Sequence, residues 1–184
     1  MDASDAAAVL ARAQQGDGEA FRVLVERHSR RAFQLAFRMT RNEQDAEDIV
    51  QESFLRAYRQ LGRFEARANF ATWLHRIVAN CAVDAMRTRH ARQQRVNESL
   101  DESAPLPLDA PDPQRLAQST EVRERVDEAL AGLSPLERAA FALRHHEGRT
   151  IEEIGRTLGL GTSASKHAVF RAVKKLRVAL NRYA

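Results

Sequence analysis

The C-terminal end of the chain carries the side chains best suited to contact a nucleic acid. Hydroxyl, basic and aromatic residues recur there at steps of three and four, which places them on one helix face: Ser163, Lys166, His167, Phe170, Arg171 and Lys174. No Asp or Glu follows Ala164. Such a helix suits the major groove of duplex DNA. The alternative is an ordinary amphipathic helix, and in either case Val169, Val173, Leu176 and Leu180 are expected to form its buried face.

A second candidate site combines aromatic and basic residues between Phe64 and Arg76. Aromatic rings stack on unpaired bases, which contributes about 1–3 kcal/mol per base, while Arg neutralises phosphate. The stretch therefore suits single-stranded nucleic acid. The alternative is that Phe70 and Trp73 belong to a hydrophobic core.

An acidic helix is the third candidate. Five acids lie among the ten residues from Glu43 to Glu52, and Asp45, Asp48 and Glu52 share a face. Metal sites in helical bundles normally add a Glu-x-x-His pair and a second carboxylate helix, and the sequence shows neither. The pattern favours a docking surface for a basic partner, with a solvated acidic face as the alternative.

The sequence offers little support for an enzyme. It has no Gly-rich phosphate loop, no GxSxG and no HExxH motif, so we expect no catalytic residue, no metal and no cofactor. The only cysteine, Cys81, occupies a core position, and a chain with one cysteine fits a reducing, cytoplasmic compartment. The apolar run Ala6–Ala11 is too short for a signal peptide, and no stretch is long enough to span a membrane.

The elements that position these candidates are all helical. Apolar residues recur at helical spacing from Phe21 to Met39, from Ala46 to Leu61 and from Phe70 to Ala85, which predicts a bundle of about four helices. In the C-terminal part, Ser134-Pro135-Leu136-Glu137 and Thr150-Ile151-Glu152-Glu153 are capping boxes. A short helix, a turn at Gly159–Thr162 and a longer helix from about Ser163 form a helix-turn-helix pattern.

Charge divides the chain into two basic parts and an acidic connection. The chain carries a net charge of +4, yet residues 97–113 hold five acids, no basic group and four of the five prolines. Proline disfavours helix, so residues 96–113 are predicted to be a flexible linker. The expected fold is all-α, with a helical bundle at residues 1–95 and a helix-turn-helix domain at residues 114–184.

These segments, in this order, resemble a bacterial sigma factor of the extracytoplasmic-function (ECF) group. The resemblance is carried by Gly16-Asp17, the run Asp45–Phe54, the run Phe70–Ile77, Leu133-Ser134, Glu147–Ile154 and Phe170-Arg171-Ala172. It covers nearly the whole chain except the linker. It implies a transcription initiation factor that binds core RNA polymerase, directs it to promoters and helps to melt the −10 region.

The resemblance also implies which residues meet which partner. The acidic helix would dock the clamp helices of the largest polymerase subunit through Asp45, Asp48, Gln51, Glu52 and Leu55. The −10 element would meet Phe64, Arg67, Ala68, Asn69, Phe70, Thr72, Trp73, Arg76, Asn80 and Arg87. The −35 element would meet Thr162, Ser163, Ser165, Lys166, His167, Phe170, Arg171 and Lys174. The polymerase flap region and an anti-sigma factor are further expected partners.

The recognition helix departs from the family's common pattern, Gly-Thr-Val-Lys-Ser-Arg-Leu. Here the aligned run is Ser163-Ala164-Ser165-Lys166-His167-Ala168-Val169, so His167 replaces the usual Ser and Ala168 the usual Arg. No consensus promoter can therefore be transferred. The alternatives are a sigma-like decoy that binds an anti-sigma factor, and an autonomous helix-turn-helix repressor, for which the acidic helix would have no role.

Overall fold

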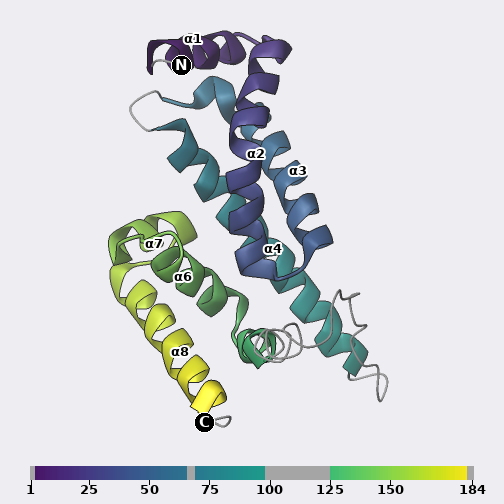
Figure 1. Cartoon of the computed structure of the whole chain (residues 1–184), viewed down its shortest axis with the longest axis vertical. Helices are drawn as coiled ribbons and strands as arrows, with labels where there is room; N and C mark the ends of the chain where they lie inside the picture. Colours follow the sequence, from purple (N-terminus) through teal and green to yellow (C-terminus); the bar gives the residue numbers. More distant parts are fainter. Residues whose placement is uncertain (1–2, 66–68, 98–124, 182–184) are drawn as a thin grey trace, which may run out of the picture. The chain divides into compact units, whose positions relative to one another are not determined.

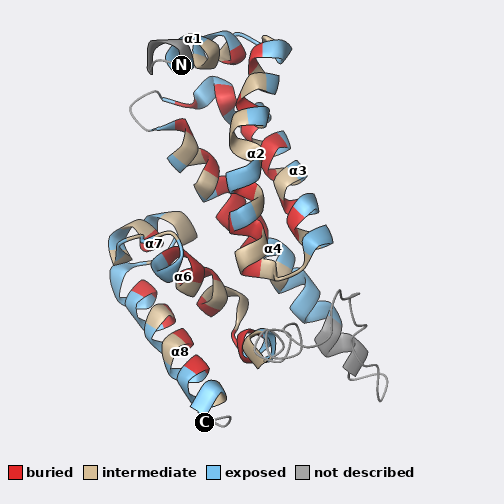
Figure 2. Ribbon diagram, viewed as in Figure 1, coloured by how far each residue is buried: buried red, intermediate tan, exposed pale blue. Residues whose placement is uncertain are grey.

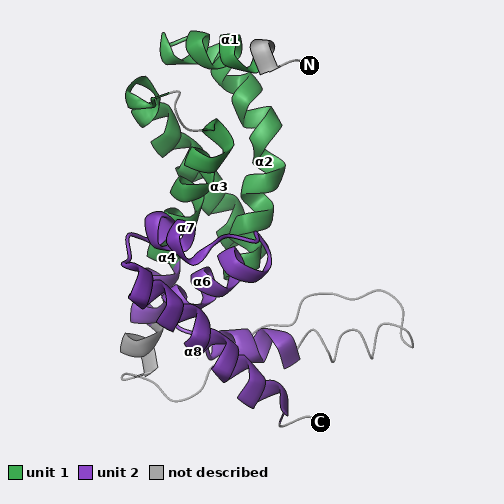
Figure 3. Cartoon of the chain, turned by 90° about the vertical axis from the view of Figure 1, so that its left-hand side faces the viewer, with its two compact units in different colours: residues 1–85 green, residues 86–184 purple. Residues whose placement is uncertain are grey.

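The computed structural model describes residues 3–65, 69–97 and 125–181, and the secondary structure in these ranges is helical throughout. The predicted all-α fold is confirmed. The chain divides into two compact units, residues 1–85 and 86–184 (Figure 3). The division falls inside a helix, and the predicted boundaries at residues 95 and 114 stay a prediction. Most of the predicted linker, residues 98–113, lies outside the described residues.

The first unit is built from α1 (Ala3–Gln14), α2 (Gly18–Thr40), α3 (Glu43–Gln60), the 3-10 turn η1 (Leu61–Arg63) and α4 (Phe70–Asn97), whose last residues belong to the second unit. Helices α2 and α3 pack lengthwise, and α1 crosses the start of α2 (Figure 1). Their buried faces follow the predicted apolar stripes, with Leu35, Met39, Ile49, Leu74 and Val78 among the core residues (Figure 2).

Side-chain caps fix where α2 and α3 begin. The Asp17 carboxylate accepts a hydrogen bond from the backbone N–H of Ala20 (3.0 Å), and the Asn42 side chain accepts one from Asp45 (2.8 Å). Between these helices the chain turns at Arg41, which has a left-handed φ of 56° and donates its N–H to the carbonyl of Phe37. Each cap satisfies backbone groups that a helix end leaves without partners.

The second unit contains a helical segment at residues 125–131, α6 (Pro135–His145), α7 (Ile151–Leu158) and α8 (Thr162–Asn181). Both predicted capping boxes are present, Ser134 with Glu137 at α6 and Thr150 with Glu153 at α7. Helix α8 packs against both α6 and α7. A core cluster of Ala129, Leu130, Leu133, Ala172 and Leu176 joins α8 to the segment before α6.

Within the described ranges, none of the helices is long and apolar enough to span a membrane.

Candidate nucleic-acid and polymerase interfaces

Helices α7 and α8 form the predicted helix-turn-helix. Gly159 ends α7 in the left-handed conformation, with φ 67°, and the N–H of Leu160 donates to the carbonyl of Gly155 (2.8 Å). A Cβ placed on Gly155 would lie 2.7 Å from the Leu160 carbonyl oxygen and 3.1 Å from Ser165 Oγ. The turn and the start of α8 therefore approach α7 so closely that only glycine fits at this position.

The buried face of α8 differs from the predicted one. The buried residues are Ser165, Ala168, Ala172 and Leu176. Val169 and Val173 are only half-buried, and Leu180 is 41% exposed, so the prediction for Leu180 was wrong. Ser165 lies against Gly155 of α7, where the two helices come close, whereas Ala172 and Leu176 pack on the helical segment before α6.

Most of the side chains predicted to meet the −35 element are exposed. They are Thr162, Ser163, Lys166, His167, Phe170, Arg171 and Lys174. Phe170 is 64% exposed, although large apolar side chains normally seek the core. Ser165 is the exception: it is fully buried, and its hydroxyl donates to the carbonyl of Gly161 (3.0 Å). Its place among the predicted DNA contacts is therefore corrected to a packing role.

Glu137 of α6 joins two cations of α8. Its carboxylate lies 3.2 Å from Arg171 Nε and 2.7 Å from Lys175 Nζ, and its side chain is only 6% exposed. Burial by itself raises the pKa of Glu137, but hydrogen bonds from Lys175 and from the backbone N–H of Ser134 outweigh it and hold the pKa below its usual value. The sequence pattern did not reveal this cluster, because its members are 34 and 38 residues apart.

In the first unit, three rings from the predicted −10 stretch form one cluster. Phe64 lies 4.9 Å from Trp73 and 6.0 Å from Phe70 between ring centroids, and Phe70 lies 5.7 Å from Trp73. Phe64 is 7% and Phe70 is 8% exposed, whereas Trp73 is partly exposed. The prediction that Phe64 and Phe70 meet the −10 element is corrected: both are core residues that pack against Trp73.

Helix α2 contributes a histidine to the back of this cluster. The His28 ring lies 5.2 Å from the ring of Phe70. Burial lowers the pKa of His28, and the positive charges of His75, Arg31 and Arg27 lower it further. A neutral imidazole is therefore favoured beneath Phe70, which suits its position against an aromatic ring.

The segment that leads into α4 is held by polar contacts. Gln14 of α1 donates to the carbonyls of Phe64 (2.7 Å) and Leu61 (3.2 Å), a role that sequence reasoning missed because Gln14 is 50 residues away. The Asn69 side chain accepts a hydrogen bond from the N–H of Ala71 (2.8 Å). The other predicted −10 residues on α4 are Thr72, Arg76 and Arg87, which are exposed, and Asn80, which is half-buried. Arg67 and Ala68 lie outside the described residues.

The acidic face of α3 is only partly available. Asp48, Gln51 and Leu55 are exposed, with Leu55 at 46%, and Asp45 is half-exposed. Glu52 instead accepts a hydrogen bond from Arg56 Nε (2.6 Å), and Arg56 reaches Asp84 of α4 (3.5 Å). A groove beside Gln51 is lined by Ser29, Arg30, Phe33, Glu47 and Val50.

The single thiol and the carboxylates show no reactive arrangement in the ranges the structure covers. Cys81 is buried as predicted, and burial raises the pKa of its thiol. No group of three or more His, Cys, Asp or Glu side chains in those ranges could hold a metal ion.

Comparison with known protein families matches both units. A model of Sigma-70 region 2 matches residues 24–92, and a model of Sigma-70, region 4 matches residues 123–176. Together the matched residues are more than half of the 184-residue chain. The two matches fall on the bundle and on the helix-turn-helix described above.

Curated relatives give the same picture. The chain is 35% identical to the RNA polymerase sigma factor CarQ of Myxococcus xanthus over 168 residues, which covers 91% of this chain and 93% of CarQ. It is 34% identical to the ECF RNA polymerase sigma factor SigE of Mycolicibacterium smegmatis over 84% of this chain, but the match spans only 59% of SigE. The ECF sigma factor SigW of Bacillus subtilis is 28% identical over 89% of this chain and 90% of SigW.

Two solved structures are similar in fold. CnrH, solved in complex with the cytosolic domain of CnrY, matches with a TM-score of 0.62 and 27% identity, covering 96% of this chain and 97% of CnrH. The sigma factor RpoE of Bartonella quintana, solved with the anti-sigma factor NepR, has the same TM-score and 24% identity. The match covers 88% of this chain and 96% of RpoE, and it shows a shared fold.

Proposed function

The chain belongs to the ECF group of sigma-70-type sigma factors, and from this premise we propose that it binds core RNA polymerase, directs it to specific promoters and helps to open the −10 region. The observation that carries the proposal is the presence of both family regions in one chain, region 2 at residues 24–92, mostly in the first unit, and region 4 at residues 123–176, in the second. The polymerase would synthesise the RNA, and no catalytic step is assigned to this chain. The cytoplasm, where bacterial promoters and polymerase are found, would be its place of action.

The exposed face of α8 supports a role in reading duplex DNA at the −35 element. It presents hydroxyl groups at Thr162 and Ser163, cations at Lys166 and Lys174, and the rings of His167 and Phe170. Hydroxyl and basic groups can hydrogen-bond base edges and phosphates, and an aromatic edge can contact a thymine methyl group.

The start of α4 supports a role at opened DNA. Trp73 is partly exposed, and Asn69, Thr72 and Arg76, which are close to it in the sequence, are exposed. One partly exposed ring fits one stacked or flipped base, which is a smaller contact than three exposed rings would make. Extrusion of a base costs a few kcal/mol, so binding energy in the opened state can offset it without ATP.

The exposed part of α3 supports docking to the clamp helices of the polymerase, through Asp48, Gln51 and Leu55. The flap region is a further proposed contact. CnrH was solved in complex with the cytosolic domain of CnrY, and its similarity to this chain supports a comparable protein partner here, in addition to polymerase. We propose that this partner is an anti-sigma factor.

Run-off transcription tests the proposal directly. Purified core polymerase and the full chain would be incubated with genomic fragments. The control reaction would contain core polymerase and the fragments without the chain. We expect discrete transcripts that require the chain. Association with polymerase without any transcript would contradict the proposal and favour the decoy, whereas tight promoter binding without polymerase would favour the repressor.

A further inference from the structure

The cations of α8 fall into two structural classes. The chain has only three lysines, and all of them lie on this helix at positions 166, 174 and 175. Lys174 and Lys175 are neighbours in the sequence and both are exposed. Because successive helical residues point about 100° apart, they face different surroundings. Lys174 lies opposite the buried stripe of α8, whereas Lys175 borders it.

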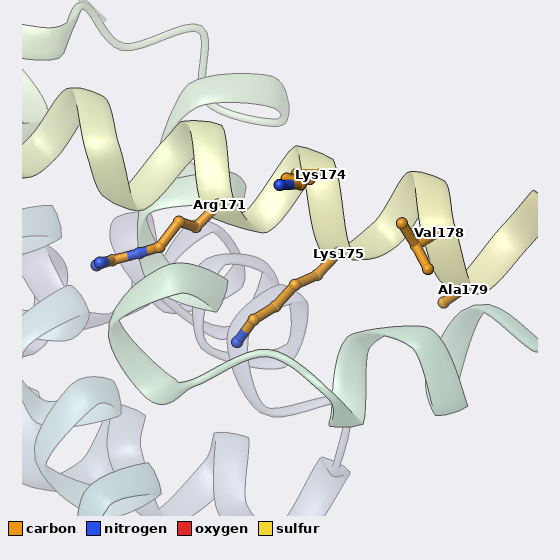
Figure 4. Close-up of a pocket in the computed structure, with 5 residues that line it drawn as sticks. All are labelled: Arg171, Lys174, Lys175, Val178 and Ala179. Carbon is orange, nitrogen blue, oxygen red and sulfur yellow. The ribbon is translucent and has the colours of Figure 1, made fainter.

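Only one of these two lysines is neutralised by the protein. Lys175 Nζ lies 2.7 Å from Glu137 Oε2, and Arg171 Nε lies 3.2 Å from Glu137 Oε1. Among the described residues, neither Lys174 nor Lys166 has an ion-pair partner. Figure 4 shows Arg171 and Lys175 extending to the same side of α8, with Lys174 on another side. All three line one open groove together with Val178 and Ala179.

Glu137 is itself held rigidly. One carboxylate oxygen accepts the backbone N–H of Ser134 (3.0 Å), while the Ser134 hydroxyl accepts the N–H of Glu137 (3.3 Å). Glu137 therefore completes the cap of α6 and pairs with α8 at the same time. A buried carboxylate that lost its cations would carry an unpaired charge, so the pairing is strongly favoured.

From this geometry we propose that Glu137 is a positioning residue that divides the cations of α8. It retains Arg171 and Lys175 on the protein surface and leaves Lys166 and Lys174 for DNA phosphates. The proposal rests on the proposed DNA-binding function of α8. It also revises the sequence prediction that Arg171 meets the −35 element, because Arg171 becomes a structural partner of α6.

The salt dependence of DNA binding distinguishes the cations paired with Glu137, which are Arg171 and Lys175, from Lys166 and Lys174, which are proposed to contact phosphates. Each phosphate neutralised on B-DNA adds about 0.9 to the slope of log K against log salt concentration. The assay would use holoenzyme, made from the full chain and core polymerase, on a promoter fragment found by run-off transcription, between about 50 and 200 mM KCl. Lys174→Gln and Lys175→Gln are matched variants, since each removes one ammonium group from neighbouring exposed positions.

We expect Lys174→Gln to lower the slope by about 0.9 and Lys175→Gln to leave it unchanged. Equal losses for both variants would overturn the division of cations. A slope unchanged in both would count against DNA binding by α8 itself, so failure of the proposed function is distinguishable from failure of this inference.

Removal of the carboxylate gives a second, opposite test. Glu137→Gln should release Arg171 and Lys175 and make the slope steeper, a gain that simple loss of structure would not produce. In the Glu137→Gln background, Lys175→Gln should then reduce the slope. A slope that stays at the wild-type value in folded Glu137→Gln would overturn the proposal. If Glu137→Gln does not fold, the comparison of the two lysine variants decides the matter.

Discussion

Single side chains determine how each candidate surface can act. Trp73 is partly exposed and packs against Phe64 and Phe70, both of which are less than a tenth exposed. Glu137 shows the same principle for charge, since one carboxylate decides the state of two cations. Whether a side chain can contact a partner therefore depends on the side chains that pack against it or pair with its charge.

The substitution Trp73→Ala should impair promoter opening and leave polymerase binding unchanged. The variant loses the one partly exposed ring of the cluster, which is proposed to stack on a base, and stacking contributes about 1–3 kcal/mol per base. Permanganate reactivity of promoter thymines measures opening, and co-purification with core polymerase is the control. Equal reactivity for the variant and the wild type would refute the stacking role.

Phe70→Ala is a useful contrast, because it should act through stability. Phe70 is buried against Phe64, Trp73 and His28, and truncation of a buried Phe costs about 3–5 kcal/mol. Loss of function in that variant would therefore be accompanied by unfolding, whereas Trp73→Ala should remain folded.

The ion pairs of Glu137 predict a dependence of stability on pH. Its folded-state pKa lies below the ordinary value of 4.5, so its contribution is complete above about pH 5 and is lost as the pH falls through the lower, folded-state value. At pH 7, Glu137→Gln should lower the free energy of unfolding by about 1–3 kcal/mol. This difference should shrink in acid, as followed by urea unfolding at a series of pH values.

Glu152→Gln is the control for that series, because Glu152 is an exposed carboxylate of the same unit. Exposed substitutions usually change stability by less than about 0.5 kcal/mol. A difference between wild type and Glu137→Gln that stays constant down to pH 3 would show that the charge of Glu137 does not stabilise the unit.

The orientation of α8 is set by the turn that joins it to α7 and by the close distance between these two helices. The turn between α7 and α8 depends on Gly159, which supplies a positive φ, and on Gly155, which lets the Leu160 carbonyl approach. The buried Ser165 of α8 lies at this close contact. The exposed face of α8 is therefore oriented by residues that do not touch DNA themselves.

Gly155→Ala should destabilise the C-terminal unit. The added methyl group would meet a backbone oxygen at 2.7 Å, and overpacking of this kind typically costs about 1–3 kcal/mol. Thermal unfolding followed by circular dichroism measures the loss. Gly161→Ala is the matched control, since nothing lies within 4 Å of its Cβ position, and its melting temperature should change little. Equal melting temperatures for Gly155→Ala and the wild type would contradict the close approach.

The exposed face of α3 that carries Asp48, Gln51 and Leu55 is the proposed docking surface for polymerase. Asp48→Arg should weaken association with core polymerase, because it reverses a charge in the centre of the proposed docking surface. Glu43→Arg makes the same charge change in the first turn of α3 on a different face. Co-purification should fall for Asp48→Arg and be retained for Glu43→Arg. Undiminished co-purification of Asp48→Arg would exclude it from the docking surface.

The whole molecule combines two units that suit different states of DNA. The α7–α8 face suits a closed duplex, and the start of α4 suits an opened strand. Both are attached to the same chain, and both match regions of one family. Binding of one unit would therefore raise the local concentration of the other near its own element.

This arrangement predicts a strict dependence on promoter spacing. Insertion of five base pairs between the −35 and −10 elements rotates one element by about half a helical turn relative to the other. Run-off transcription should fall strongly. A substitution of the spacer sequence at constant length is the control and should be tolerated. Transcription that survives the insertion would argue against joint recognition by the two units.

The sequence alone was sufficient to predict the helices and to identify the family. Apolar periodicity, capping boxes and turn glycines are local signals, because they depend on residues within one or two helical turns. The capping boxes at Ser134 and Thr150 were predicted correctly, as were most positions of the apolar stripes of the first unit, although Tyr58 is 48% exposed. The exposure of an individual contact residue is not a local property, because it depends on helices that are distant in the sequence.

Only the tertiary structure decided which of those residues can reach a partner. It placed Ser165, Phe64 and Phe70 in the interior and paired Arg171 with Glu137. Most of these outcomes depend on helices that are distant in the sequence and close in space. Periodicity shows which residues share a face, but the neighbouring helix determines whether that face is buried, neutralised or open to DNA.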